Sequence, residues 1–166
     1  MSLAGQRVDP ARYQLIPRCL VFACREGRVL LQRIPADRGA WAGRWNGVGG
    51  HLLQGESAED GARREFSEET GLSLKTILLA GLLVVDVGSS PGIGVVIFVG
   101  EAGQGDPRVG REGELAWFAP DEAAQADTVG DLPALLPRAL AVMDGAAPFT
   151  SLKTFGADGS GAVHFD

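Results

Sequence analysis

Residues 50–72 read GHLLQGESAEDGARREFSEETGL, and one short helix within them carries Arg64-Glu65 followed by Glu68-Glu69. Side chains three and four positions apart share a face of a helix, so the three glutamates project together. Carboxylates within a few ångströms repel and raise each other's pKa unless a cation sits among them. The segment therefore predicts a divalent-metal site, and such a site points to chemistry on a phosphate.

The residues around this segment indicate where the helix begins and ends. Ser57 is a suitable N-cap, and Asp60 three residues later can complete a capping box. Gly71 stands where a left-handed residue commonly ends a helix. We therefore expect one helix between Ser57 and Gly71.

An arginine and a further glutamate complete the acidic cluster. Arg64 precedes Glu68 by one turn, so its guanidinium can orient a carboxylate and limit repulsion, and Glu56 can fold back over the same side. Hard cations such as Mg²⁺, or Mn²⁺ as the alternative ion, prefer oxygen ligands. No cysteine or second histidine lies nearby, which disfavours zinc. The alternative is a solvated helix laced with Glu–Arg pairs.

Length and charge limit the class of protein and its partners. A chain of 166 residues is long enough for one domain with a real core and too short for two of ordinary size. The net charge of −6 argues against a nucleic-acid polymer or an anionic membrane as the main partner, because both favour a basic surface. A small anionic substrate is compatible with this charge if metal ions supply the positive charge.

The two cysteines, Cys19 and Cys24, lie in one apolar run, LIPRCLVFAC. Five residues apart on a strand they face opposite sides, so we expect two buried thiols of a reducing compartment rather than a disulfide or a metal pair. No apolar run approaches the length of a membrane span, and the N-terminus lacks the pattern of a signal peptide. The expected location is cytoplasmic.

The remaining pattern is one of strands and helices in irregular order. We expect strands at 15–24, 29–32, 76–87, 93–99 and 114–119, a helix from 120, a helix over 132–143 that starts firmly near Pro137, and a strand pair in 151–166. This order favours an α/β (α+β) fold, with a mixed β-sheet packed between α-helices, over a doubly wound parallel sheet. One domain over 1–166, with its core from about residue 13, is expected.

The acidic segment resembles the Nudix box, G-x5-E-x7-R-E-U-x-E-E-x-G-U, in which U is a bulky apolar residue. Every fixed position is matched, by Gly50, Glu56, Arg64, Glu65, Phe66, Glu68, Glu69, Gly71 and Leu72. So many fixed positions at fixed spacing make a specific signal. The resemblance implies the Nudix fold and a hydrolase that cleaves a nucleoside diphosphate linked to another group.

The resemblance also implies roles for single residues. The ligands of the divalent ion would be Gly50 through its carbonyl, Glu56 often through water, Glu65, Glu68 and Glu69. The position that matches Arg64 orients the glutamates, and the one that matches Glu65 acts as general base in some members. Glu65, Arg64 and Glu68 are therefore the expected catalytic residues.

The implied chemistry is metal-assisted attack of water on a phosphate. Two or more Mg²⁺ ions neutralise the diphosphate and lower the pKa of a bound water, and a carboxylate removes its proton. The family often supplies a further acid from a loop before the last core strand. Glu112 and Glu114 are the candidates, and Glu112, five residues before Trp117, fits that spacing better. For either one, an exposed loop carboxylate is the alternative.

The wider stretch WAGRWNGVGGHLLQGESAEDGARREFSEETGL is similar to that of the oxidised purine nucleoside triphosphatases of this family. In them the asparagine that matches Asn46 hydrogen-bonds the purine base, a role suited to an amide. They read the base with adjacent aspartates, of which only Asp131 is clearly in place here, and His51 stands where they commonly have lysine. The departures concern base recognition and not the hydrolytic chemistry.

Two tryptophans flank the glycine-rich loop before the helix. An aromatic face there can stack on a base and contribute about 1–3 kcal/mol. We expect Trp45 to pack within the protein, while Trp41 fits stacking and packing equally well. The predicted substrate-binding residues are Asn46, Trp41, His51 and Asp131.

Two other functions remain as alternatives. One is hydrolysis of ADP-ribose or of a dinucleoside polyphosphate within the same family. The other is a non-catalytic nucleotide-binding module, although every glutamate of the box is retained. The sequence leaves the oligomeric state open, with a homodimer as one option.

Overall fold

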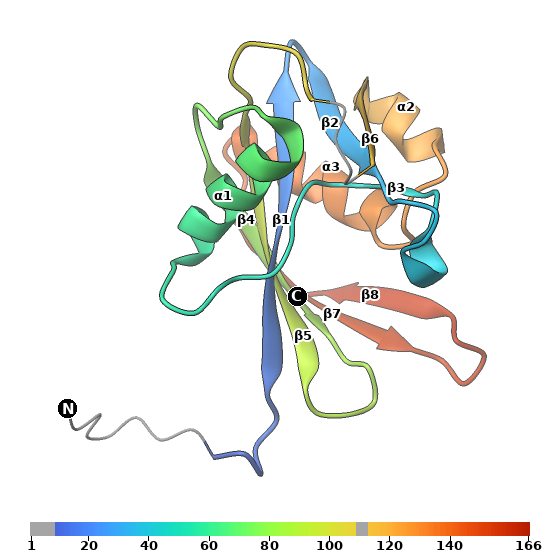
Figure 1. Ribbon diagram of the computed structural model, residues 1–166. Coiled ribbons are helices and arrows are strands. Elements are labelled where there is room, and N and C mark those ends of the chain that lie inside the picture. Colours follow the sequence, from blue (N-terminus) through green and yellow to red (C-terminus); the bar gives the residue numbers. More distant parts are fainter. Residues whose placement is uncertain (1–8, 109–112) are drawn as a thin grey trace, which may run out of the picture.

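The longest strand, β1 (Leu15–Arg25), lies near the middle of one mixed β-sheet (Figure 1). The computed structural model describes residues 9–108 and 113–166. The order across the sheet is β3 (Trp45–Asn46), β2 (Arg28–Arg33), β1, β5 (Gly92–Glu101), β4 (Leu78–Val85), β7 (Phe149–Phe155) and β8 (Gly161–Phe165), and β6 (Glu114–Phe118) also pairs with β2. The β1–β5 and β4–β7 pairs are parallel and the other pairs antiparallel, which confirms the predicted mixed sheet.

Strand β1 is packed on both of its faces, and its two cysteines show this. Cys19 belongs to the apolar cluster on one face, and Cys24 packs against the cluster on the other. The predicted placement on opposite faces is confirmed; Cys19 is buried as expected, whereas Cys24 is only half-buried. Burial raises the pKa of the Cys24 thiol to about 11, which keeps it protonated and unreactive at neutral pH.

The helix α1 (Ala58–Thr70) begins and ends as its sequence predicts. The Ser57 hydroxyl accepts a hydrogen bond from the Asp60 N–H at 3.1 Å, and Gly71 adopts a left-handed φ of 72°. Phe66 and Ala62 are fully buried against the sheet, so the polar side of the helix is turned away from the core.

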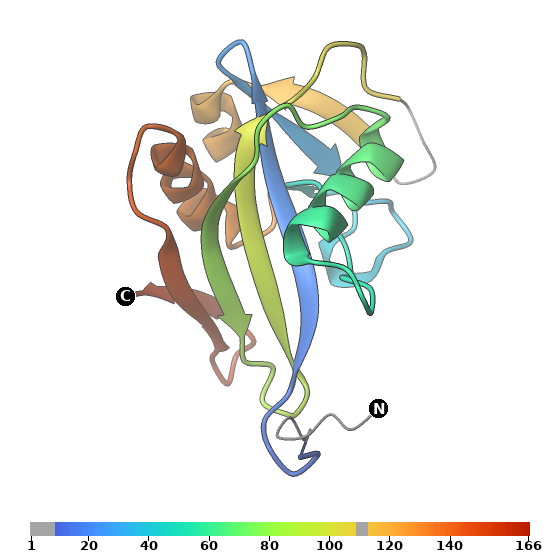
Figure 2. The same cartoon turned by 90° about the vertical axis from the view of Figure 1, so that its left-hand side faces the viewer.

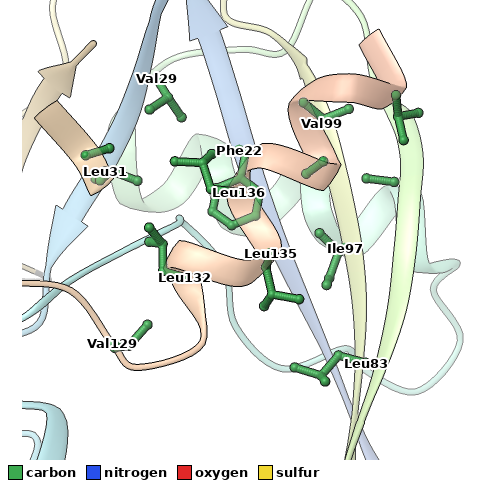
Figure 3. Packing of buried hydrophobic residues seen from close by; sticks show 14 of the residues in the cluster. Phe22, Val29, Leu31, Leu83, Ile97, Val99, Val129, Leu132, Leu135 and Leu136 are labelled. Atoms are coloured by element: carbon green, nitrogen blue, oxygen red, sulfur yellow. The ribbon is translucent and has the colours of Figure 1, made fainter. Parts of the chain in front are cut away.

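The helix α3 (Leu132–Met143) covers the opposite face of the sheet from α1, as Figure 2 shows, and the short helix α2 (Pro120–Gln125) packs beside α3. Leucines of α3 insert among side chains of the central strands, including Phe22, Leu83 and Ile97 (Figure 3). A β-sheet with helices on both faces is therefore confirmed.

The predicted start of the last helix near Pro137 is wrong, because α3 begins at Leu132. Pro133 lies in the first turn, where a helix needs no N–H donor. Pro137 lies inside the helix and removes one hydrogen bond, yet Leu135 and Leu136 before it and Ala139 and Val142 after it are buried. Packing against the sheet therefore holds the turn that the local sequence disfavours.

The loop expected between β2 and α1 contains regular structure that the sequence did not indicate. A turn of 3-10 helix, η1 (Gly39–Trp41), is followed by the two-residue strand β3, which pairs with β2. So short a strand has no periodicity to recognise. Within residues 9–108 and 113–166, no helix is long and apolar enough to cross a membrane.

The packing of α3 on the sheet predicts a large effect of truncating Leu136. Its side chain is 2% exposed, so Leu136→Ala should lower the free energy of unfolding by about 2–5 kcal/mol in urea titrations. Leu79, which is 50% exposed, is the matched control, and Leu79→Ala should cost about 0.5 kcal/mol or less. Equal losses in the two variants would contradict this account of the core.

Candidate functional site

The guanidinium of Arg64 joins three carboxylates that are separate in the sequence. Its Nη2 and Nε lie 2.8 and 3.1 Å from the two carboxylate oxygens of Glu56. Its Nη1 lies 3.0 Å from Glu65 Oε1 and 3.2 Å from Glu68 Oε2. Nη2 also donates to the carbonyl oxygen of His51 at 3.1 Å. One cation thus fixes the geometry of the acidic cluster and ties it to the preceding loop.

Glu56 is the most strongly held of these carboxylates. The hydrogen bonds from Arg64, followed by the one from the Leu53 N–H at 2.6 Å, lower the pKa of Glu56 to about 2. The same contacts with Glu56 and Glu65 raise the pKa of Arg64. The charges of the pair therefore persist at every physiological pH.

The loop before α1 brings its backbone against this cluster. The Cys19 N–H of β1 donates to the carbonyl oxygen of Gly50 at 2.9 Å, and the Val21 N–H donates to that of Val48 at 2.7 Å. A Cβ atom at Gly50 would lie 2.5 Å from the carboxyl carbon of Glu65. Glycine at this position is therefore what allows the loop to lie directly on the glutamate.

A cavity of about 650 Å³ opens beside the cluster, within the size range of small-molecule sites. It brings together most of the residues predicted for metal and substrate: Gly50, Glu65, Glu69, Trp41, Asn46, His51 and Asp131. Apolar side chains of β4 and β5, including Leu83, Val95 and Ile93, line another part of it. One cavity therefore adjoins both the acidic helix and the loop that precedes it.

The other predicted acids lie elsewhere. Glu56 and Glu68 contact Arg64 and do not line the cavity, and the side chain of Glu68 is 61% exposed. Glu112 lies outside the described residues. Glu114 begins β6 and pairs with Arg33 at 3.4 Å, away from the cavity.

The carboxylates of α1 are gathered around an arginine and not around a common point. In the part of the chain that the structure describes, no three Asp, Glu, His or Cys side chains form the arrangement of a preformed metal site. Glu65 and Glu69 nevertheless both line the cavity, and Glu65 lies next to the backbone of Gly50. These oxygen atoms are a donor set of the kind that hard divalent cations bind.

The two tryptophans of the loop have different surroundings. Trp45 packs edge-on against Phe118, with ring centroids 4.9 Å apart, so its predicted packing role is confirmed. Trp41 is 38% exposed and lines the cavity, where one face can meet a ligand. Arg44 lies near its ring, with Cζ 5.4 Å from the ring centroid.

Four polar residues that line the cavity were not predicted, and they are Arg18, Gln32, Arg38 and Lys153. Lys153 on β7 is buried and bonds Asp131 Oδ2 through Nζ at 2.9 Å. Gln32 pairs in register with Asn46, and its Nε2 has no hydrogen-bond partner among the described residues. Lys153 in β7 and Gln32 in β2 occupy inward-facing positions that usually hold apolar residues. The alternation of polar and apolar residues along these strands would therefore assign both side chains to the solvent-facing side.

Comparisons with known proteins agree with this geometry. The family profile described as the NUDIX domain matches residues 14–139. The oxidized purine nucleoside triphosphate hydrolase of Mus musculus is 41% identical to this chain, and the match covers 65% of this chain and 69% of the mouse protein. The oxidized purine nucleoside triphosphate hydrolase of Danio rerio is 38% identical, and the match covers 62% of this chain and 65% of the zebrafish protein. The matched region is thus about two thirds of their length. The structure of the MutT protein from Bacillus halodurans superposes with a TM-score of 0.72 at 21% identity, over 90% of this chain and 97% of that one.

The contacts of Arg64 predict the titration of Glu56. Carboxyl-carbon NMR should show a pKa of about 2 for Glu56, and Arg64→Gln should move it toward the ordinary value of 4.5. Because the folded-state pKa is depressed, this interaction stabilises the fold above about pH 4.5, and that contribution is lost as the pH falls toward 2.

The neighbouring arginine provides the control for this titration. Arg63 pairs with Glu59 at 2.9 Å, on the same helix but away from Glu56. Arg63→Gln should therefore leave the pKa of Glu56 low. A normal pKa for Glu56 in the unmodified protein would contradict the role given to Arg64.

Proposed function

The chain belongs to the Nudix family, whose hydrolases generally use divalent metal ions, and we propose that it is a Mg²⁺-dependent nucleotide pyrophosphohydrolase. The substrate class supported best is a purine nucleoside triphosphate, oxidised purines included, cleaved to the monophosphate and pyrophosphate. One observation carries this proposal: a single cavity adjoins the acidic helix at one part and aromatic and amide side chains at another.

The residues around Gly50 fit a hard divalent cation. Glu65 lies beside the Gly50 backbone, where a side chain would leave no room, and Glu69 lines the same cavity. We propose that these groups, with Glu56 and Glu68 from the Arg64 cluster, hold Mg²⁺, or Mn²⁺ in its place. When bound, the ions supply charge neutralisation of the phosphates and acidify a water molecule.

The chain itself supplies positioning and a base. Arg64 holds Glu65 at 3.0 Å and thereby fixes one carboxylate oxygen, while the remaining oxygen is left to face the cavity. In the proposed reaction Glu65 takes the proton of the attacking water, and Arg64 preserves its orientation. Burial of Phe66 on the same turn anchors the helix that carries both residues.

The remaining part of the cavity suits a purine base. The amide of Asn46 uses its oxygen to accept the Gly47 N–H at 2.9 Å, which leaves the amide nitrogen to donate to a ligand. Trp41 offers a ring on which a base can stack, and such stacking contributes about 1–3 kcal/mol. The names of the mouse and zebrafish relatives support a purine triphosphate as the substrate.

Removing one carboxylate that lines the cavity should lower turnover strongly without unfolding the protein. Glu65→Gln and Glu69→Gln should each lower kcat for a purine triphosphate by about 100-fold or more, since each variant loses a charge placed at the reacting phosphates. The measurement is pyrophosphate release against Mg²⁺ concentration. Glu59→Gln, which alters an acid paired with Arg63 on the same helix, is the control and should keep normal kcat.

The substrate class is tested by a turnover screen. The unmodified protein with Mg²⁺ should give its highest kcat/KM with oxidised or normal purine nucleoside triphosphates. The kcat/KM for ADP-ribose and for dinucleoside polyphosphates should be at least about tenfold lower. Each of these ligands carries a second nucleoside or sugar for which the cavity has no assigned contacts. A preference for ADP-ribose would overturn the proposed substrate, and no turnover of any nucleotide would favour a binding module.

A further inference from the structure

Lys153 is a buried charge that the hydrolytic chemistry does not use. Its side chain is 7% exposed and that of Asp131, its partner at 2.9 Å, is 17% exposed. Strand β7 lies three strands from β1 in the sheet order, so Lys153 lies about 14 Å from β1 measured along the sheet at about 4.8 Å per strand. Lys153 thus enters the cavity from a strand three places away from β1, on which the Gly50 loop lies.

Aromatic rings surround the ammonium group. Its Nζ lies 5.2 Å from the ring centroid of Trp41 and 5.5 Å from that of Phe155. All of these residues line the same cavity. A purine that enters the cavity beside Trp41 would therefore bring one of its edges within reach of Lys153 and Asp131.

The pair keeps unused hydrogen-bonding capacity. An ammonium group has three donors, and within the described residues the only hydrogen bond recorded for Lys153 Nζ goes to Asp131 Oδ2. Among the described residues, Asp131 Oδ1 likewise accepts no hydrogen bond. A charged donor and a charged acceptor therefore stand side by side against the cavity.

Buried ion pairs contribute little to stability compared with apolar side chains of the same volume. Lys153 lies on a sheet whose neighbouring cavity positions, such as Val85 and Leu83, are apolar. Its place in a cavity of ligand size is better explained by recognition of a polar group than by stabilisation of the fold.

The complementary group is a lactam, a carbonyl carbon bonded to a ring N–H. Its oxygen accepts from the ammonium while its N–H donates to the carboxylate, and the opposed partial charges of the two groups match those of the ion pair. Guanine and hypoxanthine have this group at positions 6 and 1. Adenine reverses it, with an exocyclic amine that would face the ammonium and a ring nitrogen that would face the carboxylate.

We infer that Lys153, paired with Asp131 at a position already expected to contact the base, determines base specificity by selecting purines that present a lactam edge and rejecting 6-aminopurines. This inference rests on the proposed function for the orientation of the nucleotide, with its phosphates toward Glu65. It assigns Lys153 a role in specificity and none in the hydrolytic step.

The test compares two ligands that differ only at this edge. Inosine monophosphate has the lactam and adenosine monophosphate the reversed edge, and neither can be hydrolysed as a diphosphate. Calorimetric titration in EDTA should give a Kd for inosine monophosphate at least about tenfold lower than that for adenosine monophosphate, because the mismatched edge leaves buried donors unpaired. Equal affinities in the unmodified protein would overturn the inference.

Variants assign this preference to the pair. Lys153→Met should bring the ratio of the two Kd values close to one, while the double variant Lys153→Met with Asp131→Asn should do the same without leaving a buried carboxylate unpaired. Lys75, the other lysine of the chain, is exposed and lies outside this cavity, so Lys75→Met should keep the unmodified ratio. A tenfold preference that survives in a folded Lys153 variant would overturn the assignment. If neither variant folds, the ratio in the unmodified protein decides.

This binding test is independent of turnover. Preferential binding of inosine monophosphate without hydrolysis of any triphosphate would overturn the proposed function and support the inference. Hydrolysis of inosine and adenosine triphosphates with equal kcat/KM, together with equal binding of the monophosphates, would overturn the inference and support the proposed function.

Discussion

The contact on which the site depends most is the guanidinium of Arg64 among Glu56, Glu65 and Glu68. Three carboxylates on adjacent turns and loops would repel one another in the absence of a cation. The arginine supplies that cation permanently, so the acidic helix can fold before any metal binds. Its additional bond to the His51 carbonyl oxygen holds the loop in place, and the close approach of Gly50 to Glu65 follows from the same arrangement.

The sheet gives this cluster its position relative to the rest of the cavity. Because β1 is packed on both faces, α1 and α3 cover opposite sides of the same strands. The Cys19 N–H of β1 donates a hydrogen bond to the Gly50 carbonyl oxygen and so holds the loop on β1. Residues of β4, β5 and β7 line the remainder of the cavity. The metal-ligand candidates thus lie on α1 and the loop before it, and the base-contacting candidates lie on η1, β3, β7 and the start of α3, so each set can vary without displacing the other.

Local signals predicted the acidic helix well, because its caps, its charge spacing and the burial of Phe66 all lie within one segment. The mixed sheet followed from the irregular order of elements. The start of α3 was predicted wrongly because buried leucines outweigh the local effect of Pro137. Lys153 was missed because its partner, Asp131, is distant in the sequence, and only the fold shows that a lysine in β7 faces inward. Glu112, the proposed additional acid, stays a prediction since it lies outside the described residues.

The part of the cavity beside α1 and the part beside Lys153 and Asp131 differ in charge. This difference determines which part of the nucleotide is bound first. The part beside α1 carries the carboxylates of Glu65 and Glu69, although Arg18 also lines the cavity, and the protein as a whole has a net charge of −6. These charges repel a triphosphate unless it arrives with cations. The Lys153–Asp131 pair is neutral as a whole and exerts little force at long range. Entry of the nucleotide should therefore depend on its metal ions, and discrimination between bases begins only once the ring lies on Trp41. Nucleotides that differ only in their base should therefore differ far more in their dissociation rate constants than in their association rate constants.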